Sequence, residues 1–119
     1  MKFQETQLKG CYLIDLDKNE DHRVSLNRIF CQKTLSPFLK NKSICQINRT
    51  FTRKEGVIRG LHFQNPPFAE IKIVSCTKRE VRDVAIDLRK GSPTFLHYYA
   101  ANLSESNPQC FFKLSINLI

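Results

Sequence analysis

The chain has 119 residues, a length typical of one domain, with 41% hydrophobic and 25% charged residues, which argues against disorder. Nineteen lysines and arginines against eleven acids give a net charge of +8, which suits an anionic partner but equally a solvated basic surface. We find no apolar run long enough to cross a bilayer and no apolar stretch behind the first charges, so we expect neither a transmembrane helix nor a secretory signal, and a cytoplasmic location.

Strand-like runs follow one another closely along the chain, each short, rich in β-branched or aromatic residues and bounded by turn residues. In chain order they are residues 11–16, 43–48, 57–63, 71–76, 81–88 and 94–103. One short helix is expected near residues 31–39, and Pro37 limits its length. Many short strands with closely spaced turns predict an all-β sandwich or barrel.

The run 81–88 carries two acids on one face. Alternation along a strand places Asp83 and Asp87 on the face opposite to Val84 and Ile86. Such a face lies either at the solvent surface or along a polar cavity, and composition alone favours the surface.

Residues 58–64 and the strand after them carry the candidate chemistry. Arg59 stands three residues before His62, and Lys72 follows ten residues after it. A base with two cations can abstract a proton, stabilise an enolate and hold a phosphate, although a lone histidine in a strand is more often structural. Because Arg59 and His62 point to opposite faces of a regular strand, Gly60 must mark a bulge or kink if both reach one pocket.

Metal binding is not favoured by the sequence. The five cysteines include no C-x-x-C pair, so we expect neither a zinc site nor a disulfide framework, but reduced cysteines acting as small hydrophobic residues. Metal-binding cupin barrels use two closely spaced histidines with a following glutamate. Here His62 is near Glu70 but has no second histidine beside it, and His22 and His97 are isolated.

Residues 59–64 read R-G-L-H-F-Q, which resembles the R-G-[LM]-H-[FY]-Q signature of the dTDP-4-dehydrorhamnose 3,5-epimerases. Further segments resemble the family in order and spacing up to about residue 109. They are 9–16 (opening strand), 21–23 (D-x-R-G without its glycine), 45–48 (Q-x-N), 70–76 (E-x-K-L-V-R-C), 83–89 (D-V-x-x-D-[LI]-R), 92–94 (S-P-T) and 102–107 (N-L-S-x-x-N).

The resemblance implies a cupin-type jelly roll, a homodimer, and no metal or organic cofactor. It implies epimerisation of C3 and C5 of dTDP-4-dehydro-6-deoxy-D-glucose on the way to dTDP-L-rhamnose, where the C4 ketone acidifies the protons on both flanking carbons. The catalytic residues would be His62 as the base and Lys72 as the group that stabilises the enolate oxygen.

The same resemblance implies a set of residues that bind the dTDP-sugar. Arg59 would hold the phosphate or the sugar, and Arg23 would reach into the site of the partner subunit. The remaining members of the set are Gln46, Asn48 and Asp83.

The resemblance ends near residue 109. Family members continue into closing strands that supply a tyrosine as proton donor and a late aspartate that pairs with the catalytic histidine. Residues 110–119 do not resemble that region, so we interpret residues 1–109 as the N-terminal part of the family domain, without its last strands. The unrelated tail at 110–119 suggests a truncated or frameshifted reading frame. Three further departures are Val24 and Glu80, where the family has glycine, and Arg28, where some members have an acid.

Three hypotheses follow from the sequence. The first is an epimerase of this family. The second is an inactive truncated cupin remnant that at most binds a dTDP-sugar. The third is a basic nucleic-acid binder, against which the chain shows no stripe of interleaved aromatic and basic residues. We therefore expect a dTDP-sugar substrate, and neither a nucleic acid nor a membrane as a partner.

Overall fold

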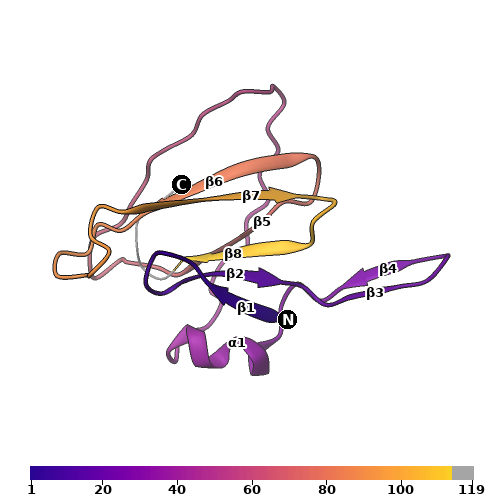
Figure 1. Ribbon diagram of the computed structural model, residues 1–119, viewed down its shortest axis with the longest axis horizontal. Coiled ribbons are helices and arrows are strands. Elements are labelled where there is room, and N and C mark those ends of the chain that lie inside the picture. The colour runs from indigo at the N-terminus through magenta and orange to yellow at the C-terminus, as the bar shows by residue number, and fades with distance from the viewer. Residues whose placement is uncertain (114–119) are drawn as a thin grey trace.

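The computed structural model of the chain describes residues 1–113. Eight strands and one helix are present in this range (Figure 1). In chain order they are β1 (Lys2–Glu5), β2 (Cys11–Asp15), β3 (Lys18–Glu20), β4 (Ser25–Asn27), α1 (Gln32–Leu39), β5 (Lys72–Ser75), β6 (Glu80–Ile86), β7 (Tyr98–Ser104) and β8 (Gln109–Lys113). Within residues 1–113, no helix is long and apolar enough to cross a membrane.

Three layers make up the body of the molecule. The central layer is an antiparallel sheet in the order β1-β2-β8-β5, with the β6–β7 pair on one side of it and α1 on the other (Figure 1). The short β3–β4 hairpin projects from the body as an arm. The all-β class predicted from the sequence is confirmed.

Side-chain alternation in the central sheet creates two apolar clusters, one on each face. Phe111 of β8 faces β6 and β7 and packs in a cluster with Leu8, Cys11, Ala85, Ala101 and Leu103. Its neighbours Cys110 and Phe112 face α1 and pack with Ile14, Leu35 and Leu39. Because β8 contributes large side chains to both clusters, it is the central strand of the core.

Helix α1 confirms the helix predicted near residues 31–39. Leu35 and Leu39, one turn apart, are buried against the sheet, and the Phe38 ring stacks on Phe3 with 4.1 Å between ring centroids. Pro37 lies inside the helix and has no N–H for the carbonyl of Lys33, four residues earlier. The hydroxyl of Ser36 donates to that carbonyl instead, at 3.1 Å, so the acceptor is satisfied.

Two of the predicted strands do not form. Residues 43–48 and 57–63 have no strand partner within residues 1–113, and every residue from 40 to 68 is exposed. A strand is stable only when a neighbouring strand pairs with its backbone, so a suitable side-chain pattern was not sufficient here. The last predicted strand, residues 94–103, begins later than expected, because residues 93–96 form a turn before β7.

The two acids of β6 correct a second expectation. Asp83 and Asp87 are 4% and 0% exposed, so they face the interior and not the solvent surface that composition favoured. Each is paired with a cation in the fold, which is the condition under which a buried carboxylate is tolerated.

Strand β8 crosses the boundary expected at residue 109. Residues 110–113, expected in the tail, pair with both β2 and β5. The other residues of that tail, 114–119, lie outside the described residues.

Candidate functional site

A buried ion pair lies between the central sheet and β6. The Lys113 ammonium donates to both carboxylate oxygens of Asp83, at 2.9 and 2.7 Å, and the two side chains are 1% and 3% exposed. Burial lowers the pKa of Lys113, while the Asp83 carboxylate opposes this shift and the nearby Lys72 ammonium adds to it. The pair therefore places one fully desolvated carboxylate and one fully desolvated ammonium beside the first residue of β5.

Lys72 is that first residue, and it lies opposite Lys113 in the sheet. Directly paired residues of antiparallel strands project to the same face, so both lysines face the interior side of β6. Lys72 keeps 30% of its side chain exposed, and its ammonium lies 3.2 Å from the Glu70 carboxylate. This arrangement gives the site two adjacent cations, of which one is sealed inside and one reaches solvent.

Gln64, the last residue of the signature 59–64, connects that segment to Lys72. With its side-chain nitrogen facing Glu70, Gln64 donates to the glutamate at 2.9 Å and to the carbonyl of Phe68 at 3.3 Å. The same glutamate pairs with Lys72, so one carboxylate joins the end of the signature to the start of β5.

His62 and Arg59 lie in the exposed segment between α1 and β5. Arg59 donates from its guanidinium to the Thr52 hydroxyl at 3.2 Å. Gly60 has a φ of 102°, so the backbone does turn between the two side chains, though not as a bulge in a strand. Among the described residues no hydrogen bond or ion pair joins His62 to Lys72, and their convergence stays a prediction.

The other predicted binding residues lie on two exposed segments. The Gln46 amide donates to the Asn48 side-chain oxygen at 3.2 Å, and both are exposed. Arg23 is at the turn of the β3–β4 arm, where its guanidinium lies 3.0 Å from the Asp21 carboxylate. Asp21 also accepts the backbone N–H groups of Arg23 and Val24, and these contacts lower its pKa. Its hydrogen bonds therefore order the turn that carries Arg23.

The acid at position 87 has a structural role that the sequence did not reveal. The Asp87 carboxylate accepts hydrogen bonds from Arg89, from Ser92 at 2.5 Å and from Thr94 at 2.7 Å. Burial raises the pKa of Asp87, but these hydrogen bonds outweigh it and hold the pKa well below its ordinary value. Arg89 also donates to the carbonyl of Lys9 at 2.6 Å, so the network fastens the corner after β6 to the loop before β2.

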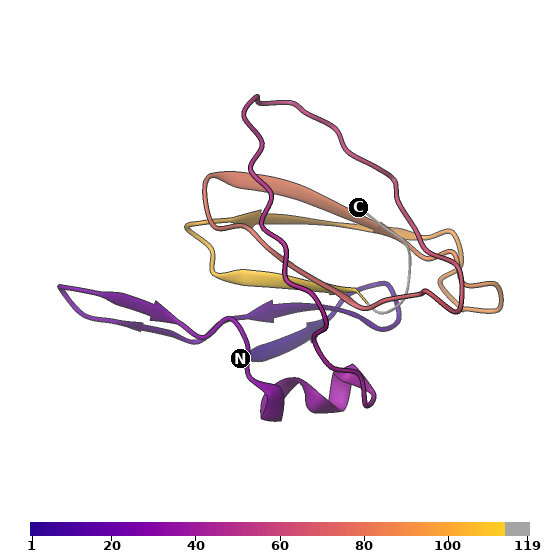
Figure 2. The same cartoon turned by 180° about the vertical axis from the view of Figure 1, so that it is seen from behind.

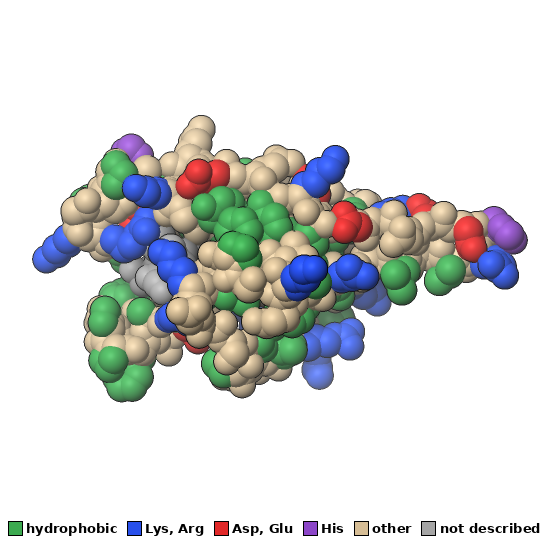
Figure 3. Space-filling view, turned by 90° about the horizontal axis from the view of Figure 1, so that it is seen from below, with side chains coloured by type: hydrophobic (Ala, Val, Ile, Leu, Met, Phe, Trp, Pro, Cys, Tyr) green, Lys and Arg blue, Asp and Glu red, His purple; other side chains and the backbone are tan. Residues whose placement is uncertain are grey.

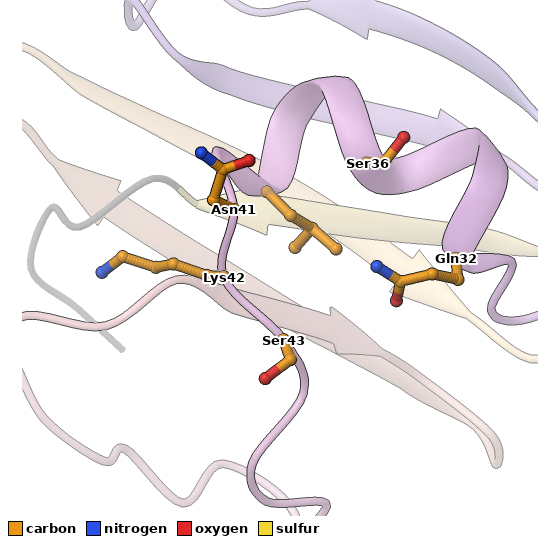
Figure 4. Close-up of a pocket in the computed structure, with 6 residues that line it drawn as sticks. Gln32, Ser36, Asn41, Lys42 and Ser43 are labelled. Atoms are coloured by element: carbon orange, nitrogen blue, oxygen red, sulfur yellow. The ribbon is translucent and has the colours of Figure 1, made fainter.

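A shallow polar pocket lies away from these residues, between α1 and the residues that follow it (Figure 4). Gln32, Ser36, Leu39, Asn41, Lys42 and Ser43 line it. It contains none of the residues predicted to bind or transform a substrate.

The sequence of residues 5–113 matches the profile of the family described as dTDP-4-dehydrorhamnose 3,5-epimerase. The chain belongs to this family. The match includes the segment 59–64, Lys72 and all of β8, and it ends on Lys113.

Curated relatives of the same name agree with this assignment. The epimerase of Sinorhizobium fredii is 36% identical over 107 residues, which cover 90% of this chain and 55% of the relative. The epimerase of Shigella flexneri is 42% identical over 108 residues, which cover 90% of this chain and 59% of the relative. The chain thus spans a little over half the length of these relatives.

Solved structures of epimerases from this family share the fold. The Bacillus anthracis enzyme, crystallised with TDP and PPi, superposes with a TM-score of 0.88 at 29% identity, covering 99% of this chain and 71% of that one. The Sulfolobus tokodaii enzyme gives a TM-score of 0.85 at 34% identity, covering 98% and 66%. These superpositions identify the sandwich as the cupin-type β fold that the resemblance implied.

Lys113 is the residue of this region that sequence reasoning missed. It lies in the stretch set aside as an unrelated tail. The signal that could have found it is the alternation of residues 109–113, in which Phe111 and Lys113 share one face and Cys110 and Phe112 the other.

Proposed function

We propose that the chain carries the enolising half of a dTDP-4-dehydrorhamnose 3,5-epimerase, acting on the carbons next to the C4 ketone of dTDP-4-dehydro-6-deoxy-D-glucose. The observation that carries this proposal is the family match over residues 5–113, which includes the signature with His62 and the strand with Lys72. The bound TDP in the Bacillus anthracis structure supports a thymidine nucleotide as the recognised group.

The chemistry assigns His62 as the base that removes the proton from C5 or C3. The electron pair left on carbon moves onto the ketone oxygen, and the Lys72 ammonium stabilises the resulting enolate. A partly exposed ammonium with a sealed ammonium beside it is a suitable partner for a developing negative charge. The proposal requires the exposed segment 57–63 to pack over the start of β5, because only then does His62 reach C3 and C5 beside the ketone.

The remaining predicted residues bind the nucleotide sugar in this proposal. Arg59 provides a guanidinium for the diphosphate, because a planar fork of donors suits phosphate oxygens. Gln46, Asn48 and Arg23 supply further donors. Asp83 was also predicted to bind the substrate, but it is buried and paired with Lys113. In this proposal it therefore holds the Lys113 ammonium beside Lys72 and does not contact the sugar. A homodimer, a cytoplasmic location and chemistry without a metal or an organic cofactor belong to the same proposal.

A second candidate is a protein that binds the dTDP-sugar without converting it. The observation in its favour is the exposure of residues 40–68, a segment that includes His62, Arg59, Gln46 and Asn48.

Two measurements separate the two candidates. Binding of dTDP and of the dTDP-sugar is followed by ligand-observed NMR, and conversion to the L-rhamno ketone by product NMR. We expect Arg59→Ala to weaken binding roughly tenfold, as loss of a charged hydrogen bond does, while the matched control Arg82→Ala on β6 leaves it unchanged. We expect Lys72→Met to keep binding but slow enolisation. Binding without any enolisation favours the second candidate, and absence of binding contradicts both.

A further inference from the structure

Lys113 is the only buried lysine or arginine in residues 1–113, with 1% of the residue exposed. Figure 3 shows the lysine and arginine side chains of one face as separate groups at the surface of the molecule. The Lys113 ammonium, by contrast, binds both oxygens of Asp83 and lies 5.4 Å from the centre of the Phe111 ring. Because lysines are rarely buried without such partners, this position indicates a role that a surface lysine cannot fill.

The carboxylate that binds Lys113 is also within reach of Lys72. The two lysines lie directly opposite each other in the sheet, and such pairs have Cβ atoms about 4.5–5.5 Å apart on one face. Burial lowers the pKa of Lys113 and the Lys72 ammonium adds to this shift, so the two ammonium groups interact electrostatically. Both side chains have the same length and a flexible stem, so Asp83 is a possible partner for either of them.

The observed partner of Lys72 is instead Glu70, which follows the exposed segment between α1 and β5. Figure 2 shows residues 43–68 of that segment as an arch that leaves the end of α1, passes both sheets and returns to β5. Glu70 is 46% exposed and lies 3.2 Å from the Lys72 ammonium. An ion pair exposed in this way is weak, whereas an unpaired carboxylate in the interior is strongly unfavourable. Glu70 would therefore lose Lys72 to Asp83 if Asp83 had no other cation.

The second interior carboxylate of β6, Asp87, does not compete for Lys72. It accepts hydrogen bonds from Arg89 and from two hydroxyl groups beyond it. Asp83 is thus the interior acid that decides where the Lys72 ammonium lies, and both of its oxygens are bound by Lys113.

We propose that Lys113 is a positioning residue for the enolising site: by occupying Asp83, it keeps the Lys72 ammonium on the solvent-facing side, where it meets the ketone oxygen of the substrate. Without the Lys113 ammonium, Lys72 turns inward to neutralise Asp83, and the enolate oxygen loses its cation. The link to the reaction rests on the proposed function, whereas the position of Lys72 is a property of the fold and is measured without substrate.

Acetylation of lysine amines by acetic anhydride, followed by mass spectrometry of peptides, measures where Lys72 lies. An amine held in a buried ion pair reacts more slowly than an exposed one. We expect Lys113→Met to slow acetylation of Lys72 roughly fivefold or more, while the exposed Lys2 keeps its rate as the internal reference. The double variant Lys113→Met/Asp83→Asn is expected to restore the rate at Lys72, because the interior then offers no charge.

A variant at the surface gives a second test that leaves the buried pair intact. Glu70→Gln removes the outer partner of Lys72, and the fold is expected to be retained because Glu70 is 46% exposed. Since Lys113 still occupies Asp83, we expect Lys72 to stay outside and to be acetylated at least as fast as in the unaltered chain.

Proton exchange at C3 or C5 of dTDP-4-dehydro-6-deoxy-D-glucose, measured beside dTDP binding, connects this position to the reaction. We expect Lys113→Met to slow exchange on the order of a hundredfold without weakening dTDP binding, and the double variant to recover most of the rate. A merely structural role of Lys113 would reduce binding and exchange together and would show no recovery. Lys2→Met is the control and is expected to keep both.

Three results would overturn the proposal. Lys72 is acetylated at an unchanged rate in folded Lys113→Met, or more slowly in Glu70→Gln, or it turns inward in Lys113→Met while exchange continues at the original rate. Failure of the proposed function is distinct from these, because the unaltered chain then exchanges no proton. Slowed acetylation of Lys72 in Lys113→Met would in that case still support the control of its position by Lys113.

Discussion

Replacing Lys113 with methionine isolates the buried ion pair between β8 and β6. The variant keeps the length and apolar stem of the side chain but removes the ammonium that lies 2.7 and 2.9 Å from the Asp83 oxygens. The carboxylate then remains in the interior without its strongest partner. Breaking a buried pair in this way costs about 3–5 kcal/mol, a large part of the roughly 5–15 kcal/mol that stabilises a typical domain.

The assay is urea unfolding at neutral pH, with a double variant to separate pairing from packing. We expect Lys113→Met and Asp83→Asn each to lower the free energy of unfolding strongly, and the double variant to be more stable than the sum of the two losses predicts. Lys18→Met is the control, because its partner Glu20 and Lys18 itself are both exposed, and its loss is expected to stay below about 1 kcal/mol. A loss at Lys113 as small as the control's, or strict additivity in the double variant, would refute the reasoning.

Three further predictions concern other buried groups. Because hydrogen bonds hold the folded pKa of Asp87 below its ordinary value of 3.8, the ionised group stabilises the fold above about pH 4. This contribution is lost as the pH falls through the folded pKa, so Asp87→Asn is expected to flatten the acid side of the stability profile, and an unchanged profile contradicts the network. Burial raises the pKa of Cys110 to about 11. Iodoacetamide at pH 8 is therefore expected to label the exposed Cys45 and to leave Cys110 unmodified until urea unfolds the chain. Equal labelling of the two cysteines in the folded protein would argue against a buried β8. Leu35→Ala on α1 is expected to cost about 2–5 kcal/mol in urea unfolding, and a change under 1 kcal/mol would show that α1 does not cover the sheet.

The fold class and the helix could be predicted because they depend on local patterns. Short β-branched runs indicated β2, β5 and β6. The helix was predicted at the right place, but it continues past Pro37 to Leu39 and ends where Lys40 and Asn41 adopt left-handed backbone conformations. The arch shows the limit of such patterns. Residues 57–63 have a strand's composition, but a strand also needs a neighbour at hydrogen-bonding distance, and that depends on the rest of the chain.

The interior of the site illustrates a second limit. Alternation correctly placed Asp83 and Asp87 on one face of β6, but the choice between solvent and interior depended on partners distant in sequence. Asp83 is paired with Lys113, thirty residues later, and Asp87 with Arg89 and the two hydroxyls beyond it. A buried carboxylate can be recognised from sequence only when its cation can be recognised too.

We propose that His62 and Lys72 together enolise a 4-keto nucleotide sugar. The measurement that tests it most directly is proton NMR of dTDP-4-dehydro-6-deoxy-D-glucose in deuterated water with the purified chain. We expect the C3 or C5 proton signal to disappear faster than in buffer. This loss is expected to be abolished in His62→Ala and retained in the matched control His97→Ala, whose side chain is also exposed. Exchange no faster than in buffer, or exchange that persists in His62→Ala, would contradict it.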